Sequence, residues 1–162
     1  MEDIYKALSG FLTGTLPEYL EAVSTPDTPC PPIQDGAVVF GTVDVSRMQQ
    51  KCVVSVMPDG QEDGEGELAS WKTESRLTVT FILSGASYDV LVRRMVRYPA
   101  AFRSAILDDP TLCGKVEDVR IGKRTFHPDC GTADRQMTAC EVELEITTDE
   151  EIPVKKGVWN DG

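Results

Sequence analysis

Two segments of this chain alternate between apolar and other residues, and they constrain the fold more than any other feature. Residues 77–83 and 136–147 each place apolar residues at every second position. These positions are Leu77, Val79, Phe81 and Leu83 in the first segment and Cys140, Val142, Leu144 and Ile146 in the second. Since successive strand side chains point to opposite faces, each segment predicts a strand with one buried face. In the second segment the other face is acidic, with Glu141, Glu143 and Glu145.

Apolar residues at helical spacing predict helices that could cover the buried face of the sheet. Residues 2–13 carry apolar residues three and four apart, and a second short helix begins near Thr15 with Pro17 in its first turn. Residues 88–98 predict a helix that Pro99 stops or kinks, and a second helical piece follows. The order of elements predicts an α+β fold, a mostly antiparallel β-sheet with helices packed on one face, a long β-hairpin loop and extended arms.

Shorter apolar runs predict the first strands of the sheet. Residues 37–41 read as a short β run, and residues 51–57 as a strand that ends at the turn Pro58-Asp59-Gly60. The acidic, glycine-rich residues 59–69 predict a mobile surface loop. With the strand over residues 71–83, these elements predict an antiparallel pair with a long acidic tip.

The other segments complete the expected organisation. Residues 116–121 predict a strand and residues 122–131 a turn or loop, whereas the proline-rich residues 24–36 predict an ordered coil or arm. The chain has 162 residues, which is typical of one domain. We expect a single domain over residues 1–148 and a C-terminal tail over 149–162.

The charge and cysteine content narrow the class of protein. A formal net charge of −11 argues against general nucleic-acid binding, because phosphate contacts need Lys and Arg. No apolar run approaches the roughly 20 residues of a membrane span, and the N-terminus lacks the basic region of a secretory signal. We therefore expect a soluble protein with no membrane partner. Five irregularly spaced cysteines favour free thiols, mostly buried, over a disulfide framework.

Several residues could in principle carry chemistry. His127, Asp129 and Cys130 offer three metal ligands within four residues, but a structural zinc site needs four. His127 could also pair with a cysteine, although no known signature surrounds it. The acidic loop matches a calcium loop only in composition, because its flanks are strands. We predict no catalytic residue, no metal and no cofactor.

Much of the positive charge lies in one third of the chain, and the N- and C-terminal thirds are acidic. Such a charge distribution occurs in monomers. It also occurs in proteins that self-associate by packing the basic surface of one copy against the acidic surface of the next. On the second interpretation the subunit or partner interface would include Arg93, Arg94, Arg97, Arg103, Lys123 and Arg124.

The segment SAILDDPTLCGKVEDVRIG (104–122) predicts a corner between a helix and a strand. The helix is expected to end at Asp108-Asp109-Pro110, because a residue before proline is disfavoured in a helix. Leu112 is expected to turn back into the core, and Gly114 to permit the turn into the next strand.

Taken together, four features resemble the tail terminator (tail completion) proteins of long-tailed bacteriophages, over about residues 1–148. They are the N-terminal helix IYKALSGFLTGTLPEYL, a hairpin leading into RLTVTFIL and directly into the helix SYDVLVRRMVRYPAAFRSAIL, the corner DDPTLCGKVEDVRI, and the closing strand ACEVELEIT. The corner pattern "acid, Pro-Thr-Leu-x-Gly-x-Val" is the most specific of these. The family often has Gly where this chain has Cys113, which indicates that a small residue is tolerated there.

The resemblance implies a non-enzymatic virion structural protein. Such proteins form a hexameric ring that caps the tail tube, ends its polymerisation and joins the head connector. The implied partners are copies of itself, the tail tube protein, and connector or neck proteins, with DNA only as passing cargo. The implied location is the head-proximal end of the virion tail, after assembly in the host cytoplasm.

An acidic loop facing the lumen of such a ring would repel passing DNA; its residues would be Glu62, Asp63, Glu65 and Glu67. Two other interpretations stay open. The chain could be a head-completion or neck joining protein, or an unrelated small α+β binding module.

Overall fold

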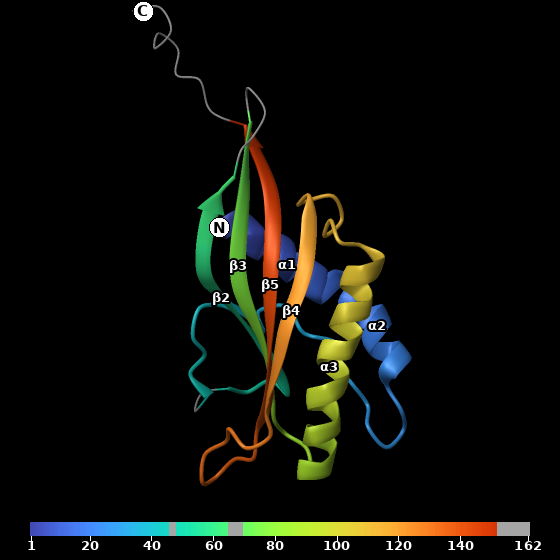
Figure 1. Cartoon of the computed structure of the whole chain (residues 1–162). Helices are drawn as coiled ribbons and strands as arrows, with labels where there is room; N and C mark the ends of the chain where they lie inside the picture. The colour runs from blue at the N-terminus through green and yellow to red at the C-terminus, as the bar shows by residue number, and fades with distance from the viewer. Residues whose placement is uncertain (46–47, 65–69, 152–162) are drawn as a thin grey trace, which may run out of the picture.

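A computed structural model of the chain describes residues 1–45, 48–64 and 70–151. Within these ranges the helices lie on one face of a five-stranded sheet (Figure 1). The predicted α+β class is confirmed. In chain order the elements are α1 (Glu2–Gly14), α2 (Leu16–Val23), β1 (Val38–Phe40), β2 (Cys52–Asp63), β3 (Ser70–Leu83), α3 (Tyr88–Asp108), β4 (Asp118–His127) and β5 (Thr138–Glu151).

The sheet has the strand order β1-β2-β3-β5-β4. β1 pairs with β2 in parallel, and the other neighbours are antiparallel. Phe81 on β3 lies opposite Val54 on β2 and Cys140 on β5, which fixes the register at the centre. β4 forms one edge of the sheet, and β1 covers only a short part of β2 at the other.

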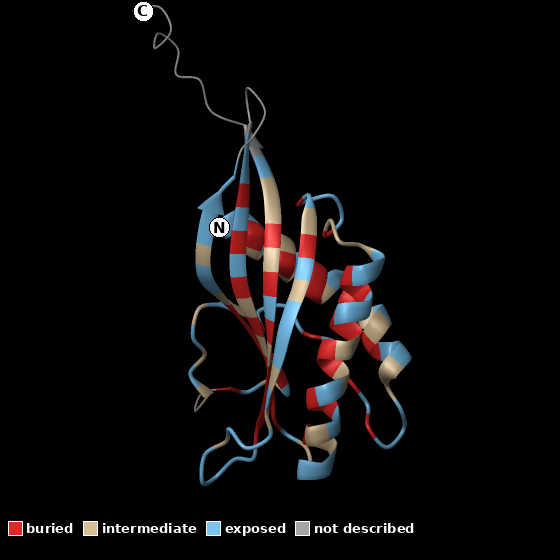
Figure 2. Ribbon diagram, viewed as in Figure 1, coloured by how far each residue is buried: buried red, intermediate tan, exposed pale blue. Residues whose placement is uncertain are grey.

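The core lies between the sheet and the three helices. Buried and exposed residues alternate along β3 and β5, as the sequence predicts (Figure 2). The ring centroid of Phe81 lies 5.5 Å from that of Phe102 and 6.1 Å from that of Tyr98 on α3, and Phe102 also contacts Phe11 on α1. Such aromatic pairs stabilise a core by about 0.5–1.5 kcal/mol beyond their buried area. Aromatic packing thus joins the N-terminal helix, α3 and the central strand.

The opposite face of the sheet, here called the outer face, is largely polar. A small apolar cluster lies at one end of it, and Val43 and Val45 pack against that cluster. Its buried members are Met48, Val53, Ile82, Met137 and Ala139. Further along β3 and β5 this face carries threonines and charged residues. No helix covers it in the described part of the chain.

Pro58 does not end the second strand, contrary to the expectation of a turn there. β2 continues to Asp63, so residues 59–63 are strand and not loop. The register with β3 shifts between Pro58 and Gly60, and β1 has already ended opposite Val56. A proline is tolerated at a bulge on an edge, because no neighbouring strand needs its missing N–H. The strand therefore passes through a sequence that is typical of a turn.

Pro99 does not divide the long helix either. α3 is one helix of 21 residues with Pro99 buried inside it. A proline in a helix interior costs about 3 kcal/mol. Its neighbours Tyr98, Ala101 and Phe102 are all buried against the core. Their packing offsets the lost hydrogen bond, which periodicity alone could not show.

The last two strands are longer than predicted. β4 runs on to His127 through a bulge between Ile121 and Arg124, where a loop was expected. β5 continues to Glu151, past the expected start of the tail at residue 149. A glycine inside a strand often marks a bulge, and Gly122 does so here. The single domain over 1–148 remains a prediction, and residues 152–162 lie outside the described residues.

Candidate interaction surfaces

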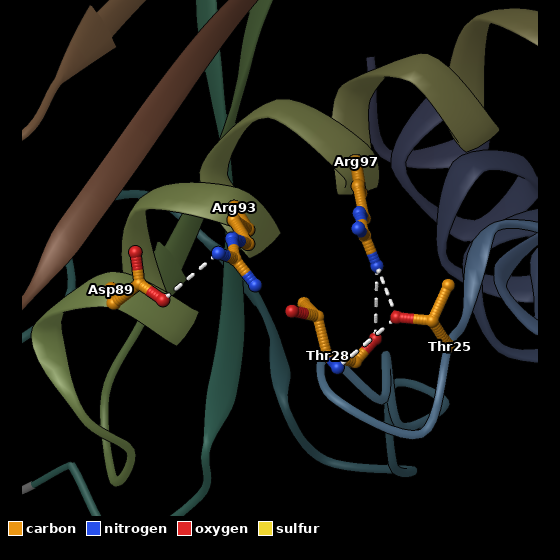
Figure 3. A network of polar contacts seen from close by, with 5 residues as sticks. All are labelled: Thr25, Thr28, Asp89, Arg93 and Arg97. Atoms are coloured by element: carbon orange, nitrogen blue, oxygen red, sulfur yellow. Dashed lines mark hydrogen bonds and ion pairs between the residues drawn. The ribbon is translucent and has the colours of Figure 1, made fainter.

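Two of the predicted interface arginines, Arg94 and Arg97, hold the proline-rich arm against α3, and Figure 3 shows the contacts of Arg97 with Thr25 and Thr28. Arg94 is only 4% exposed, and its Nε donates to the carbonyl of Pro29 at 2.7 Å. A terminal nitrogen of Arg97 donates to the carbonyls of Val23 and Thr28 and to the hydroxyl of Thr25, at 3.0–3.3 Å. The arm therefore packs on its own helix, as an ordered coil.

The arm accounts for the burial of Arg94 on α3. A proline-rich segment has few N–H groups and cannot join a sheet, so its carbonyls need other donors. Side chains of α3 provide them: besides the two arginines, the hydroxyl of Tyr98 donates to the carbonyl of Pro31 at 2.5 Å. Burial raises the pKa of that hydroxyl, which keeps it a donor. Arg94 is thus occupied within the chain and is closed to a partner while the arm stays in place.

The solvent-facing side of α3 carries exposed arginines and exposed apolar residues. Arg93 forms an ion pair with Asp89 at 3.2 Å, Arg103 is exposed, and Val96 and Leu107 are 49% and 68% exposed. These residues recur at spacings of three and four, so they share one side of the helix. We call them the α3 stripe: Arg93, Val96, Ala100, Arg103 and Leu107.

Lys123 and Arg124 lie at the bulge of the edge strand β4, and both are exposed. A lysine and a bulge on an edge strand both disfavour pairing with a strand of another chain. Their role in an interface remains a prediction, but edge-to-edge pairing is not the contact that this strand favours.

A hollow of about 680 Å³ lies on the outer face of the sheet. The bulges of β2 and β4 lie on either side of it: the β2 bulge is beside Leu77 and Arg76 on β3, and the β4 bulge is beside Glu143 on β5. At the β4 bulge, a Cβ on Gly122 would lie 3.3 Å from that of Glu143, so a glycine keeps this side open. The charged residues that line the hollow define the outer-face patch: Asp59, Arg76, Arg120, Glu143 and Glu145.

Charges in this patch are arranged in rows. Glu145 lies opposite Arg76 on one side and Arg120 on the other. Asp59 accepts a hydrogen bond of 2.7 Å from the hydroxyl of Thr78. The patch thus contains three carboxylates and two guanidinium groups. Glu141 adds a fourth carboxylate further along β5. This site was not predicted from the sequence, in which Gly60 and Gly122 beside the bulges are its only indication.

The predicted acidic loop is only partly described. Glu62 and Asp63 lie on β2, and as consecutive strand residues they point to opposite faces of the sheet. Asp63 accepts a hydrogen bond of 3.2 Å from the hydroxyl of Thr73. Glu65 and Glu67 lie outside the described residues. The lumen-facing role of the four acids stays a prediction.

The corner after α3 has the geometry expected from the sequence. Leu112 is 1% exposed, and the φ angles of Leu112, Cys113 and Gly114 are 50°, 60° and 79°. The carboxylate of Asp109 accepts hydrogen bonds from the amide and hydroxyl of Thr111 and from the amide of Cys113, at 2.7–3.2 Å. These bonds, led by the one from the Thr111 hydroxyl, lower the pKa of Asp109. One side chain therefore holds three left-handed residues in place.

The residues considered for chemistry are dispersed. His127 lies on β4 with its Nε2 3.5 Å from Oε1 of Glu141. Among the described residues, no group of three or more His, Cys, Asp or Glu is placed to hold a metal ion. All five cysteines are free, and Cys30, Cys52 and Cys140 are buried, as predicted. Burial raises the pKa of Cys140 to about 11, so this thiol stays protonated at neutral pH.

Comparisons with known proteins give likenesses to solved structures alone. No family model matches the chain, and no curated protein matches it. A chain in a structure described as the virion of a native gene transfer agent particle shows a TM-score of 0.42 and 9% identity, over 70% of this chain and 79% of that chain. At these values the likeness does not define a family for this chain. No helix in the described ranges is long and apolar enough to cross a membrane.

Proposed function

We propose that this chain is a tail terminator, a non-enzymatic virion protein whose ring caps a phage tail tube, ends its polymerisation and joins it to the head. The observation that carries the proposal is the corner at residues 108–116. Its sequence resembles the most specific element of that family, and its geometry explains the pattern. Cys113 has a φ of 60°, where glycine is favoured, and the family often has glycine at this position.

The order of elements supports the same proposal. The structure has the elements in the order that the resemblance implies: an N-terminal helix, a hairpin, a long helix, the corner and a closing strand. On this proposal the partners are other copies of the chain, the tail tube protein, and connector or neck proteins. The protein would lie at the head-proximal end of the tail after assembly in the host cytoplasm, and DNA would pass through without being held.

The test is tail assembly in the absence of this chain. A phage that lacks it is expected to make tubes of uncontrolled, excessive length, measured by negative-stain electron microscopy. Supply of the wild-type chain from a plasmid should restore a single tail length. Tubes of normal length that fail to join heads would instead identify a neck joining protein and contradict the terminator role.

A further inference from the structure

We propose that the α3 stripe of one copy docks on the outer-face patch of a second copy. This inference rests on the proposed function, since it names the contact that would build the ring. The stripe and the patch are the two surfaces of the described chain that combine exposure with opposite charge.

The α3 stripe offers apolar and positively charged groups together. Val96 and Leu107 are among the most exposed large apolar residues, and Arg93 and Arg103 flank Val96 along the same line. Arg94 and Arg97 are already bonded to the arm, so they do not compete for a partner. Solvent exposure of Leu107 and Val96 has no benefit in a free monomer, whereas burial stabilises a contact by about 25 cal/mol per Å² of apolar area.

The outer-face patch offers the complementary charge. It carries three carboxylates against two guanidinium groups, and Glu62, Glu74 and Glu141 lie on the same face. Its hollow of about 680 Å³ can accept side chains from a partner. Arg103 extends from a helix with solvent on its outer side, so it can form an ion pair with a glutamate of this face, such as Glu141.

The spacing of the charges also agrees. Arg93 and Arg103 are ten residues apart on a helix, which is about 15 Å. Glu141 and Glu145 are four residues apart on a strand, which is about 13 Å. A helix lying along β5 of a second copy can therefore place both of its arginines near glutamates at once.

The positions of the two surfaces determine the kind of assembly. α3 lies on the helix-covered side of the sheet (Figure 1), whereas the side chains of the patch lie on the other face. A contact between unlike surfaces on opposite sides is head-to-tail, so repeating it gives a ring when the rotation closes, not a two-fold dimer. The alternative, pairing of β4 edges, is disfavoured by the bulge and Lys123.

A charge-swap series tests the contact. The variants are Arg103→Glu, Glu141→Arg and the two combined, with Lys6→Glu as a control that makes the same charge change at an exposed site on α1. The full chain is examined by sedimentation velocity over a concentration series up to its solubility limit, and circular dichroism checks that each variant is folded. Each single reversal is expected to weaken association at least tenfold, the double variant to restore it, and Lys6→Glu to behave as wild type.

Three results would overturn the inference: a wild-type chain that stays monomeric throughout the series, single reversals that associate like wild type, or a double variant that remains as weak as the single ones. Failure of this contact is separable from failure of the proposed function. If the charge-reversed variants form rings as the wild type does, the proposed contact is wrong but the terminator role is not affected. A restored double variant, with normal tail length in phage that lack the chain, rejects the terminator role only.

Discussion

Truncation of Leu112 tests whether the corner is a packing device. The side chain is 1% exposed, and Leu112→Ala removes three carbon atoms from a closed site. Transfer alone accounts for about 0.8 kcal/mol per carbon. A cavity adds to this, which gives an expected loss of about 2–5 kcal/mol in the free energy of unfolding. The left-handed backbone at this position adds nothing to the difference, because leucine and alanine both carry a Cβ.

Urea unfolding followed by circular dichroism measures the effect. Leu107→Ala is the matched control, since Leu107 ends the same helix but is 68% exposed, and its loss should stay within about 0.5 kcal/mol. A loss below about 1 kcal/mol for Leu112→Ala would refute the argument that this leucine anchors the corner in the core.

Three further predictions follow from the corner, the arm and the thiols. Cys113→Gly should raise the free energy of unfolding by about 0.5–1 kcal/mol, because it relieves a left-handed residue, whereas Cys113→Ala should leave it unchanged in the same urea assay. Arg94→Met leaves the carbonyl of Pro29 without its donor, so it should lower the free energy of unfolding by about 1–3 kcal/mol and speed proteolysis within residues 24–36. Arg103→Met is the control at an exposed position, and equal cleavage of the two variants would contradict the role of Arg94. At neutral pH iodoacetamide should label the exposed Cys113 well before the buried Cys140, whose pKa is about 11, and equal rates by mass spectrometry would contradict the described burial.

The sequence allowed good predictions where a single period or a local motif decides the structure. Alternation predicted the faces of β3 and β5, and helical spacing predicted α1 over residues 2–13 against the observed Glu2–Gly14. The end of the helix, the inward Leu112 and the turn at Gly114 were predicted because Pro110 restricts the residue before it and Gly114 permits a left-handed turn.

The errors arose where tertiary contacts override a local signal. Pro58 was predicted to end a strand and Pro99 to stop or kink a helix. A bulge accommodates Pro58 within β2, and packing against the core offsets the cost of Pro99 within α3. Arg94 was predicted at a subunit or partner interface, and only the folded arm reveals its hydrogen bond to the carbonyl of Pro29. The outer-face patch lies between two bulges at neighbouring cross-strand rows, and their positions depend on the register between strands that are distant in the sequence.

The most direct test of the central claim is the mass and symmetry of the assembled particle. Each chain has a mass of 17.8 kDa, so native mass spectrometry of the assembled protein should show a species of about six chains. Negative-stain images should show a six-fold ring around an open centre. A two-fold dimer as the largest species would contradict both the ring and the head-to-tail contact from which it is built.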